Sequence, residues 1–239
     1  MINLVDLGVT KYKNSWDVQQ KIFHLRAEQK CPDILLLNEH HPVYTLGKGS
    51  NVNHLLATKD ELNSNGIDVY ETDRGGDVTY HGPGQLVGYP ILDLNNYYND
   101  IHRYLRDLEE VIIHTLSEYG INAKRDEQFT GVWVGNDKIA AIGVKVSRWI
   151  TMHGFALNVN TDLSYFDRII PCGIFHKGVT SMERVLNRSI DMNEVKGTLV
   201  KKFAEVFQVQ IGEVNRDYFL ESIQQLSSES TECALQENQ

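Results

Sequence analysis

The feature that most constrains the fold is a short apolar run, Ile34-Leu35-Leu36-Leu37, with no polar residue among its members. A strand with one face in water alternates polar and apolar residues, whereas a strand covered on both faces is apolar throughout. The run therefore predicts a strand inside the protein, with another layer packed on each side of it.

Helical patterns lie before, between and after the strand patterns. Over 99–119 the apolar residues recur at steps of three and four, and Gly120 follows as the expected C-cap. An earlier helix is expected to begin with Ser15 as its N-cap. Two later helices are expected at about 192–207 and 216–226.

The remaining apolar segments predict strands. They cover residues 1–7 as an edge strand, 34–37, 43–46, 67–70, 86–94, 129–134, 138–146 and 149–160. Gly135-Asn136-Asp137 is typical of a turn and joins its two flanking strands into a hairpin. Because the order of helices and strands is too irregular for a doubly wound sheet, we expect an α/β sandwich of the α+β kind.

The chain of 239 residues shows no internal repeat and no Pro/Ser-rich linker, so a single domain is expected over residues 1–226. Residues 227–239 begin with the polar, acidic stretch Ser227-Ser228-Glu229-Ser230-Thr231-Glu232. This composition predicts a disordered acidic tail.

Composition narrows the classes of function. The formal net charge of −9 argues against nucleic acid as a partner, because phosphate contacts need clustered Lys and Arg. No apolar run is as long as a membrane span, so no membrane association is expected. The N-terminus lacks a secretory pattern, and the three cysteines lack the spacing of a disulfide framework. A cytoplasmic, reducing location is therefore expected.

The densest unusual segment is 74–85, which holds four glycines. Glycines free backbone N–H groups and let a ligand approach the main chain, Arg74 offers a fork of donors, and His81 is expected to titrate near neutral pH. The alternative is a pair of tight turns with a structural Arg74, and composition alone leaves both open. The segment matches neither a Walker phosphate loop nor G-x-G-x-x-G, so no nucleotide cofactor is expected.

Cys172 is the one candidate for a nucleophile. It stands between Pro171 and Gly173, a pattern typical of a turn where a thiol is open to solvent. Most single cysteines are buried and inert, so a structural role stays open at this point. Cys31 leads into the buried strand, and Cys233 falls in the polar tail.

A thiol that attacks an acyl group needs a cationic or basic neighbour, because a free thiol is mostly protonated at pH 7. The candidates are Lys138, His81, His153 and His176. For Lys138 the alternative is a solvated surface lysine, and its spacing alone does not bring it to Cys172.

Four segments together resemble the lipoyl(octanoyl) transferases, the LipB family. The first is Arg74-Gly75-Gly76 followed by Thr79-Tyr80-His81-Gly82-Pro83-Gly84-Gln85-Leu86-Val87 and Tyr89. The others are 138–144, 153–158, and Pro171-Cys172-Gly173 with Val179-Thr180-Ser181. Their order agrees with the family, as do the 34 positions that separate Lys138 from Cys172. The resemblance covers about residues 33 to 185, with one departure at His41, where a second proline is expected.

The resemblance implies a mixed sheet flanked by helices, in the catalytic-domain fold of biotin and lipoate protein ligases. It implies transfer of an octanoyl or lipoyl group from acyl-carrier protein to a lysine of lipoyl domains, in 2-oxoacid dehydrogenases and the glycine cleavage H protein. Cys172 would form the acyl thioester, and Lys138 would lower its pKa and move protons, with no cofactor and no metal. The implied substrate-binding residues are Arg74, Gly75, Gly76, Asp77, Val78, Thr79, Tyr80 and His81; Ala141, Ile142 and Gly143; and Gly154, Phe155 and Ala156.

Two further hypotheses concern the substrates. About six buried methylenes at ~0.8 kcal/mol each would favour an eight-carbon chain. Candidates for the apolar lining are Ile142, Val144, Phe155 and Leu157, although strand alternation turns about half of them to the core. A basic patch for acidic partners is expected at Lys145, Arg148 and Lys177.

Four alternatives stay open at this point. A lipoate–protein ligase would activate a free acid with ATP, and a related amidotransferase would move lipoyl groups between proteins. A metal-binding module would use Cys172 and His176 with His81 or His153. A carrier-binding protein without activity is the fourth.

Overall fold

A mixed eight-stranded sheet forms the centre of the computed structural model, which describes residues 1–170 and 178–236. Along the sheet the order is β11-β1-β2-β6-β10-β9-β8-β7. The strands are β1 (Ile2–Thr10), β2 (Asp33–His40), β6 (Gln85–Ile91), β7 (Lys124–Arg125), β8 (Val132–Val134), β9 (Asp137–Ser147), β10 (Ile150–Asn158) and β11 (Ile211–Glu213). β1 is parallel to β11 and β2, and the other neighbours are antiparallel.

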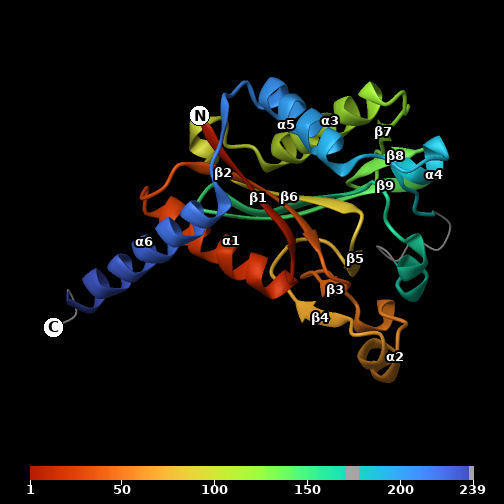
Figure 1. Ribbon diagram of the computed structural model, residues 1–239, viewed down its shortest axis with the longest axis horizontal. Coiled ribbons are helices and arrows are strands. Elements are labelled where there is room, and N and C mark those ends of the chain that lie inside the picture. Colours follow the sequence, from red (N-terminus) through yellow and green to blue (C-terminus); the bar gives the residue numbers. More distant parts are fainter. Residues whose placement is uncertain (171–177, 237–239) are drawn as a thin grey trace.

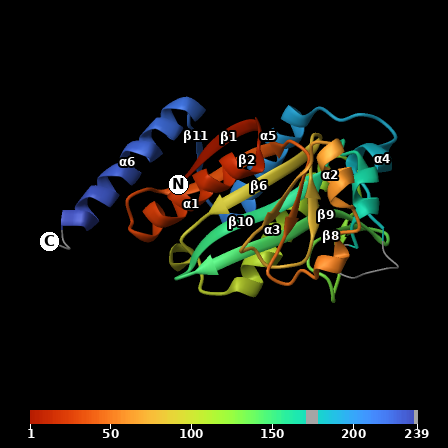
Figure 2. The same ribbon diagram turned by 90° about the horizontal axis from the view of Figure 1, so that it is seen from below.

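Helices cover both faces of this sheet (Figures 1 and 2). One face carries α3 (Ile101–Glu118) and α5 (Met192–Phe207), and the other carries α1 (Tyr12–Ala27) and α6 (Arg216–Gln236). Leu35 and Leu37 enter the core under α3 and α5, whereas Ile34 and Leu36 enter the core under α1 and α6. The apolar run therefore does form a strand covered on both faces, as predicted.

A second sheet of three strands forms a small lobe beside the main body. It contains β3 (Val43–Leu46), β4 (Asp68–Glu71) and β5 (Thr79–His81), with η1 (Val52–His54), α2 (Lys59–Ser64) and η3 (Leu163–Arg168) close by. The lobe has its own apolar cluster around Tyr44, Leu62 and Tyr80. The remaining elements are η2 (Leu94–Asn96) and α4 (Met182–Leu186).

Three predictions of secondary structure are confirmed closely. α3 begins after its N-cap Asp100, and Gly120 follows it with φ of +72°. β8 and β9 form the expected antiparallel hairpin. α5 occupies the expected range, 192–207. No helix among the described residues is both long enough and apolar enough to cross a bilayer.

Other predictions were wrong at the ends of the chain. α1 begins after Lys11, and Ser15 is a buried residue of its inner face instead of the N-cap. β1 is not an edge strand, because β11 returns from the far end of the chain and pairs outside it. The last helix does not end at 226 but continues to Gln236, through most of the expected disordered tail. Each added helical residue adds a hydrogen bond, so a helix anchored by Phe219 and Ile223 extends into polar sequence. That residues 1–226 form one domain stays a prediction.

Candidate active site

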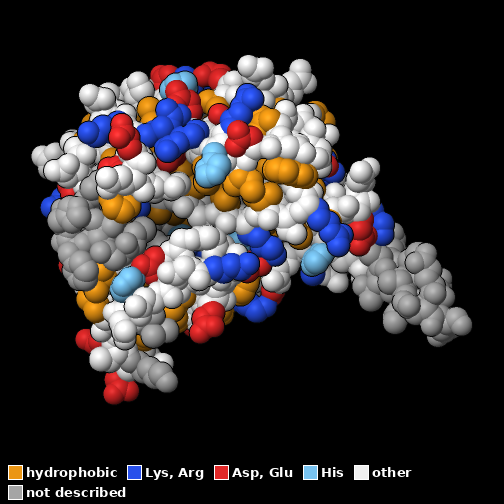
Figure 3. Space-filling view, turned by 180° about the vertical axis from the view of Figure 1, so that it is seen from behind, with side chains coloured by type: hydrophobic (Ala, Val, Ile, Leu, Met, Phe, Trp, Pro, Cys, Tyr) orange, Lys and Arg blue, Asp and Glu red, His pale blue; other side chains and the backbone are white. Residues whose placement is uncertain are grey.

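A pocket of about 470 Å³ lies where the outer part of the main sheet meets the small lobe. In Figure 3 the small lobe projects below the main body at lower left. Strands β9 and β10 supply one wall of the pocket, and the loop at 74–79 supplies another. The start of α3 adds Ile101 and Leu105, and η3 adds Phe166. The volume is within the range of sites for small molecules, ~300–1,000 Å³.

Small residues on two paired strands form part of the wall. The antiparallel register of β9 and β10 places Gly143 opposite Gly154 and Ala141 opposite Ala156. A methyl group on Gly154 would lie 2.1 Å from the carbonyl oxygen of Gly88, and one on Gly143 would lie 2.8 Å from that of Gly75. Two of the predicted segments, separate in sequence, therefore meet in space, and the neighbouring backbone leaves no room for a side chain at Gly143 or Gly154.

The loop that follows β4 lies against the edge of β9. The N–H of Gly75 donates to the carbonyl of Val144 at 2.9 Å. Arg74 is 7% exposed, and its Nη2 donates to the carbonyl oxygen of Thr45 at 2.6 Å and to Thr45 Oγ1 at 2.9 Å. Arg74 thus has the structural role that was one of its two predicted readings. It also lines the pocket.

Most of the expected substrate-binding residues line this pocket. They are Arg74, Gly75, Gly76, Asp77, Val78, Thr79, His81, Ala141, Ile142, Gly143, Gly154, Phe155 and Ala156. Tyr80 does not, because alternation along β5 turns it into the small lobe, where it stacks on Tyr165 at 4.6 Å. Of the residues expected to form the acyl slot, Leu157 turns into the core instead. That these residues bind substrate stays a prediction.

His81 does not behave as the sequence predicted. Its Nδ1 lies 2.7 Å from Gln85 Oε1, and burial, the largest effect, lowers its pKa to about 3. His40, beside it, has its Nε2 2.6 Å from the hydroxyl of Tyr89, and burial lowers its pKa to about 4. Both imidazoles are therefore neutral at pH 7 and act as hydrogen-bonding groups.

The expected basic patch is altered by an ion pair. Lys145 Nζ lies 2.7 Å from Asp73, which also accepts a hydrogen bond from His153. Arg148 is exposed in the turn between β9 and β10. Lys177 lies outside the described residues. Lys145 is therefore a partly exposed cation that is paired with Asp73, next to the loop at 74–79, and the basic patch stays a prediction.

Lys138 begins the wall formed by β9 and lines the pocket. Its N–H donates to the carbonyl of Gly178 at 2.9 Å, and its carbonyl accepts from the N–H of Thr180 at 3.0 Å. Its Nζ lies 4.8 Å from the centre of the Trp133 ring, a cation–π contact. Cys172 and His176 lie outside the described residues, so the structure does not test their predicted roles.

The sequence did not indicate several residues that line the pocket, among them Tyr12, Ile101 and Phe129. Ile101 does belong to the apolar pattern of α3, but nothing local in the sequence assigns it to a pocket and not to the core. Among the residues that the structure describes, no three His, Cys, Asp or Glu side chains are grouped as metal ligands would be.

Comparison with known proteins defines the class. Residues 11–204 match the family model for the lipoyl protein ligase A/B catalytic domain. A bipartite lipoate protein ligase from Thermoplasma acidophilum superposes with a TM-score of 0.72 at 18% identity, over 95% of this chain and 91% of its own. A biotin protein ligase from Aquifex aeolicus gives 0.53 at 15% identity, over 86% and 70%. The chain belongs to the lipoyl protein ligase A/B catalytic domain family, with the mixed α/β fold that its motifs implied.

Its sequence relatives narrow the kind of enzyme. An octanoyltransferase from Flavobacterium johnsoniae is 49% identical over 227 residues, which cover 88% of this chain and 98% of that one. An octanoyltransferase from Rubrobacter xylanophilus is 53% identical over 201 residues, covering 83% and 90%. The predicted resemblance to the lipoyl(octanoyl) transferases is confirmed, and the protein is an acyltransferase.

Proposed function

We propose that the protein transfers an octanoyl group from an acyl-carrier protein to a specific lysine of a lipoyl domain, through an acyl thioester on Cys172. The acceptors are the lipoyl domains of 2-oxoacid dehydrogenases and the glycine cleavage H protein, and the reaction takes place in the cytoplasm. The octanoyltransferases among the relatives support the acyl group.

The observation that carries this mechanism is the pairing of Lys138 with residues 178–180. These residues directly follow the seven that hold Cys172, and Val179 lines the pocket together with Lys138. On the other side of those seven, Ile170 donates its N–H to the carbonyl of His54, next to the small lobe. The chain thus reaches the Cys172 segment next to the small lobe and continues after it to Val179, in the wall of the pocket.

The chemistry balances without nucleotide or metal. The thiolate of Cys172 attacks the carrier thioester, the C–S bond to the carrier breaks, and the ammonium of Lys138 gives its proton to the departing thiolate. In the second step the acceptor lysine attacks the Cys172 thioester, and the neutral Lys138 takes the proton that its amine loses. One thioester replaces another in the first step, and formation of the amide makes the second favourable. A cationic Lys138 near the sulfur favours the thiolate.

The test is the intact mass of the protein after exposure to octanoyl-acyl-carrier protein without nucleotide. We expect the wild type to gain one octanoyl group and Cys172→Ala to gain none. Cys31→Ala is the matched control, because Cys31 is buried and burial raises its pKa to about 11. It should gain mass as the wild type does. Lys138→Ala should gain mass slowly.

An adduct that persists in Cys172→Ala would refute the assignment of Cys172 as the nucleophile. A parallel reaction with free octanoate and ATP separates the ligase activity, since several structural relatives are ligases. Product formed only in that second reaction would favour the ligase.

A further inference from the structure

Asp73 lies directly before the loop at 74–81 and connects this loop to two strands of the main sheet. Its Oδ1 lies 2.7 Å from Nε2 of His153 on β10, and its Oδ2 lies 2.7 Å from Nζ of Lys145 on β9. The hydrogen bond from His153 is the main reason that the pKa of Asp73 lies well below its usual range, and Lys145 adds to it. The carboxylate is therefore charged at pH 7, and charge-assisted hydrogen bonds of this kind are stronger than neutral ones.

His153 has an unusual backbone for a residue within a strand. Its φ is +59°, in the left-handed region that a residue other than glycine rarely occupies. In a regular strand its side chain would share a face with Phe155 and Leu157, under α3 and α5. Instead its ring lies 6.4 Å from Trp16 of α1, on the opposite face. The left-handed residue thus turns the imidazole to the side where Asp73 accepts its hydrogen bond.

This backbone conformation is supported by its neighbours. The N–H of His153 donates to Oε1 of Gln19, a fully buried residue of α1, at 3.2 Å. The ladder between β10 and β6 begins only at Phe155, opposite Gly88. Strain of this kind persists where surrounding contacts hold it, often next to functional sites.

The contacts of Asp73 act on the loop at 74–81. Gly75, two residues later, bonds to Val144 beside Lys145, and Gly76 accepts from the N–H of Gly49 at 3.0 Å. With glycine at both positions, the loop has no side chain there to hold it on the sheet. Lys145 lies seven residues from Lys138 along β9, about 23 Å at the rise of a strand. Asp73 is therefore too far away to touch the reacting groups.

We propose that Asp73, held by His153 and Lys145, is a positioning residue that fixes the loop at 74–81 in the conformation that binds the acyl chain. The inference rests on the proposed function, because binding of the acyl chain by residues 74–81 is part of that proposal. It assigns His153 and Lys145 to the same task, in place of a role beside Cys172 or in a docking patch.

The first test needs no substrate. Hydrogen exchange measured at the amide of Gly75 reports how often the loop leaves β9. We expect Asp73→Asn to raise that exchange about ten-fold, the loss of roughly one charged hydrogen bond, while amides of β2 keep the wild-type rate. Glu71→Gln is the matched control, because it removes the same charge from an exposed residue two positions earlier. Unchanged exchange at Gly75 in Asp73→Asn would overturn the proposal.

The second test separates positioning from chemistry. Asp73→Asn and Lys145→Met should each raise the KM for octanoyl-acyl-carrier protein about ten-fold and leave kcat within about two-fold, because binding is lost before the chemical step. Asp73→Glu should restore part of the loss. His153→Asn removes the imidazole and keeps the backbone conformation, because Asn tolerates a left-handed backbone. A rise in KM in this variant therefore reports the lost hydrogen bond to Asp73. In the double variant Asp73→Asn/Lys145→Met, the loss of binding free energy calculated from KM should be smaller than the sum of the losses in the two single variants.

A fall in kcat with unchanged KM, or additive effects in the double variant, would contradict the proposal. The two hypotheses can fail separately. If wild-type protein gains no acyl group on Cys172, the proposed function fails, while hydrogen exchange still decides whether Asp73 holds the loop.

Discussion

The N–H of Lys138 donates to the carbonyl of Gly178, at 2.9 Å. This bond joins the start of β9 to the chain that follows residues 171–177. A second bond, from the N–H of Thr180 to the carbonyl of Lys138, joins the same two segments. A lysine that serves a nucleophile on that segment needs its own backbone fixed, because its side chain is long and flexible. Gly131 lies beside the side chain of Lys138.

Gly131→Ala should disturb Lys138 directly. Gly131 has φ of +129°, and a methyl group there would lie 2.7 Å from the carbonyl oxygen of Ala140 and 3.4 Å from Cε of Lys138. The strained backbone should cost about 1–3 kcal/mol of stability, and the acylation rate should fall more than ten-fold. Single-turnover acylation and urea unfolding measure the two effects. Gly212→Ala is the control, because nothing lies within 4 Å of its added methyl group. Equal activity in the two variants would contradict the prediction.

Acid should destabilise the protein through its buried histidines. Burial lowers the pKa of His40 to about 4 and that of His81 to about 3, from an ordinary value of 6.5. Below pH 6.5 the unfolded chain binds protons that the folded protein excludes until about pH 4. The stabilisation is thus complete above pH 6.5 and is lost as the pH falls, by up to ~2.7 kcal/mol per unit for two groups.

Urea unfolding from pH 7 to pH 4.5 tests this prediction. His40→Gln should remove about half of the slope that the two histidines contribute, because only one of them then remains. His24→Gln, at an exposed position, should keep the wild-type slope. A wild-type slope in His40→Gln would show that His40 is not the source.

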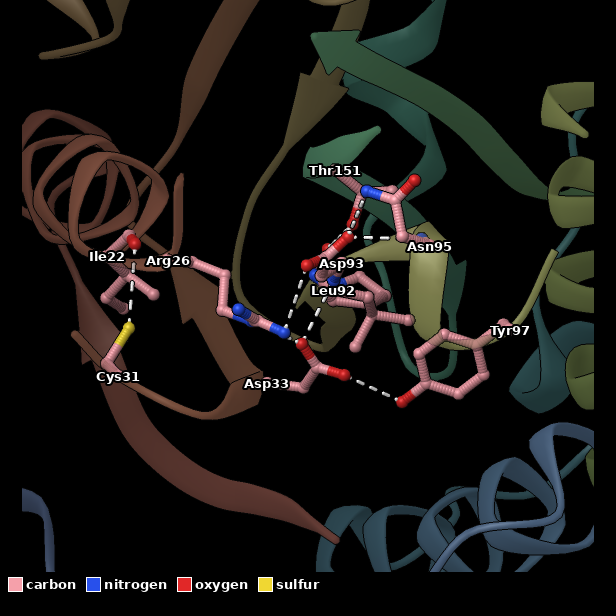
Figure 4. A network of polar contacts seen from close by, with 10 residues as sticks. Ile22, Arg26, Cys31, Asp33, Leu92, Asp93, Asn95, Tyr97 and Thr151 are labelled. Carbon is pink, nitrogen blue, oxygen red and sulfur yellow. Dashed lines mark hydrogen bonds and ion pairs between the residues drawn. The ribbon is translucent and has the colours of Figure 1, made fainter. Parts of the chain in front are cut away.

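A buried ion network around the first residue of β2 should matter for stability and not for activity (Figure 4). Arg26 lies 2.7 Å from Asp33 and 3.3 Å from Asp93, and the hydroxyl of Tyr97 donates to Asp33 at 2.8 Å. These four residues are not among those that line the pocket. Arg26→Met leaves two buried carboxylates without their cation, so unfolding should become easier by about 3–5 kcal/mol.

Lys13→Ala is the control for this network, because Lys13 pairs with Asp17 on the surface, where both side chains are about half exposed. Such pairs contribute about 0–1 kcal/mol. Thermal unfolding of both variants, with KM measured below the transition, tests the prediction. An equal effect of the two changes, or a raised KM in Arg26→Met, would contradict it.

Gly197→Ala should stabilise the protein. Gly197 is exposed within α5, and an added methyl group meets nothing within 4 Å. Because glycine in the middle of a helix is less favourable than alanine, the gain should be about 0.5–1 kcal/mol with unchanged kcat. Urea unfolding measures it. A loss of stability would show that α5 needs a glycine at this position.

Local patterns were sufficient for the elements with strong periodicity. The apolar steps of α3, the turn at 135–137 and the uniform run of β2 each belong to a few neighbouring residues, so the structure agrees with them. The prediction at Ser15 was wrong because a serine can cap a helix or lie inside one, and only the packing of α1 on β10 decides between them. The prediction that β1 is an edge strand was wrong because its outer neighbour, β11, lies 209 positions later, with Ile211 opposite Ile2.

The sequence by itself determined the family and the segments of the site, because motif order and spacing belong to the chain. Tertiary structure alone decided what those residues contact. It buried His81 until its pKa fell, placed Arg74 on Thr45, and joined Asp73 to His153 and Lys145. Thr45 lies 29 positions from Arg74, and Lys145 and His153 lie 72 and 80 positions from Asp73. The pKa and the contacts of each side chain therefore depend on residues that only the fold brings near it.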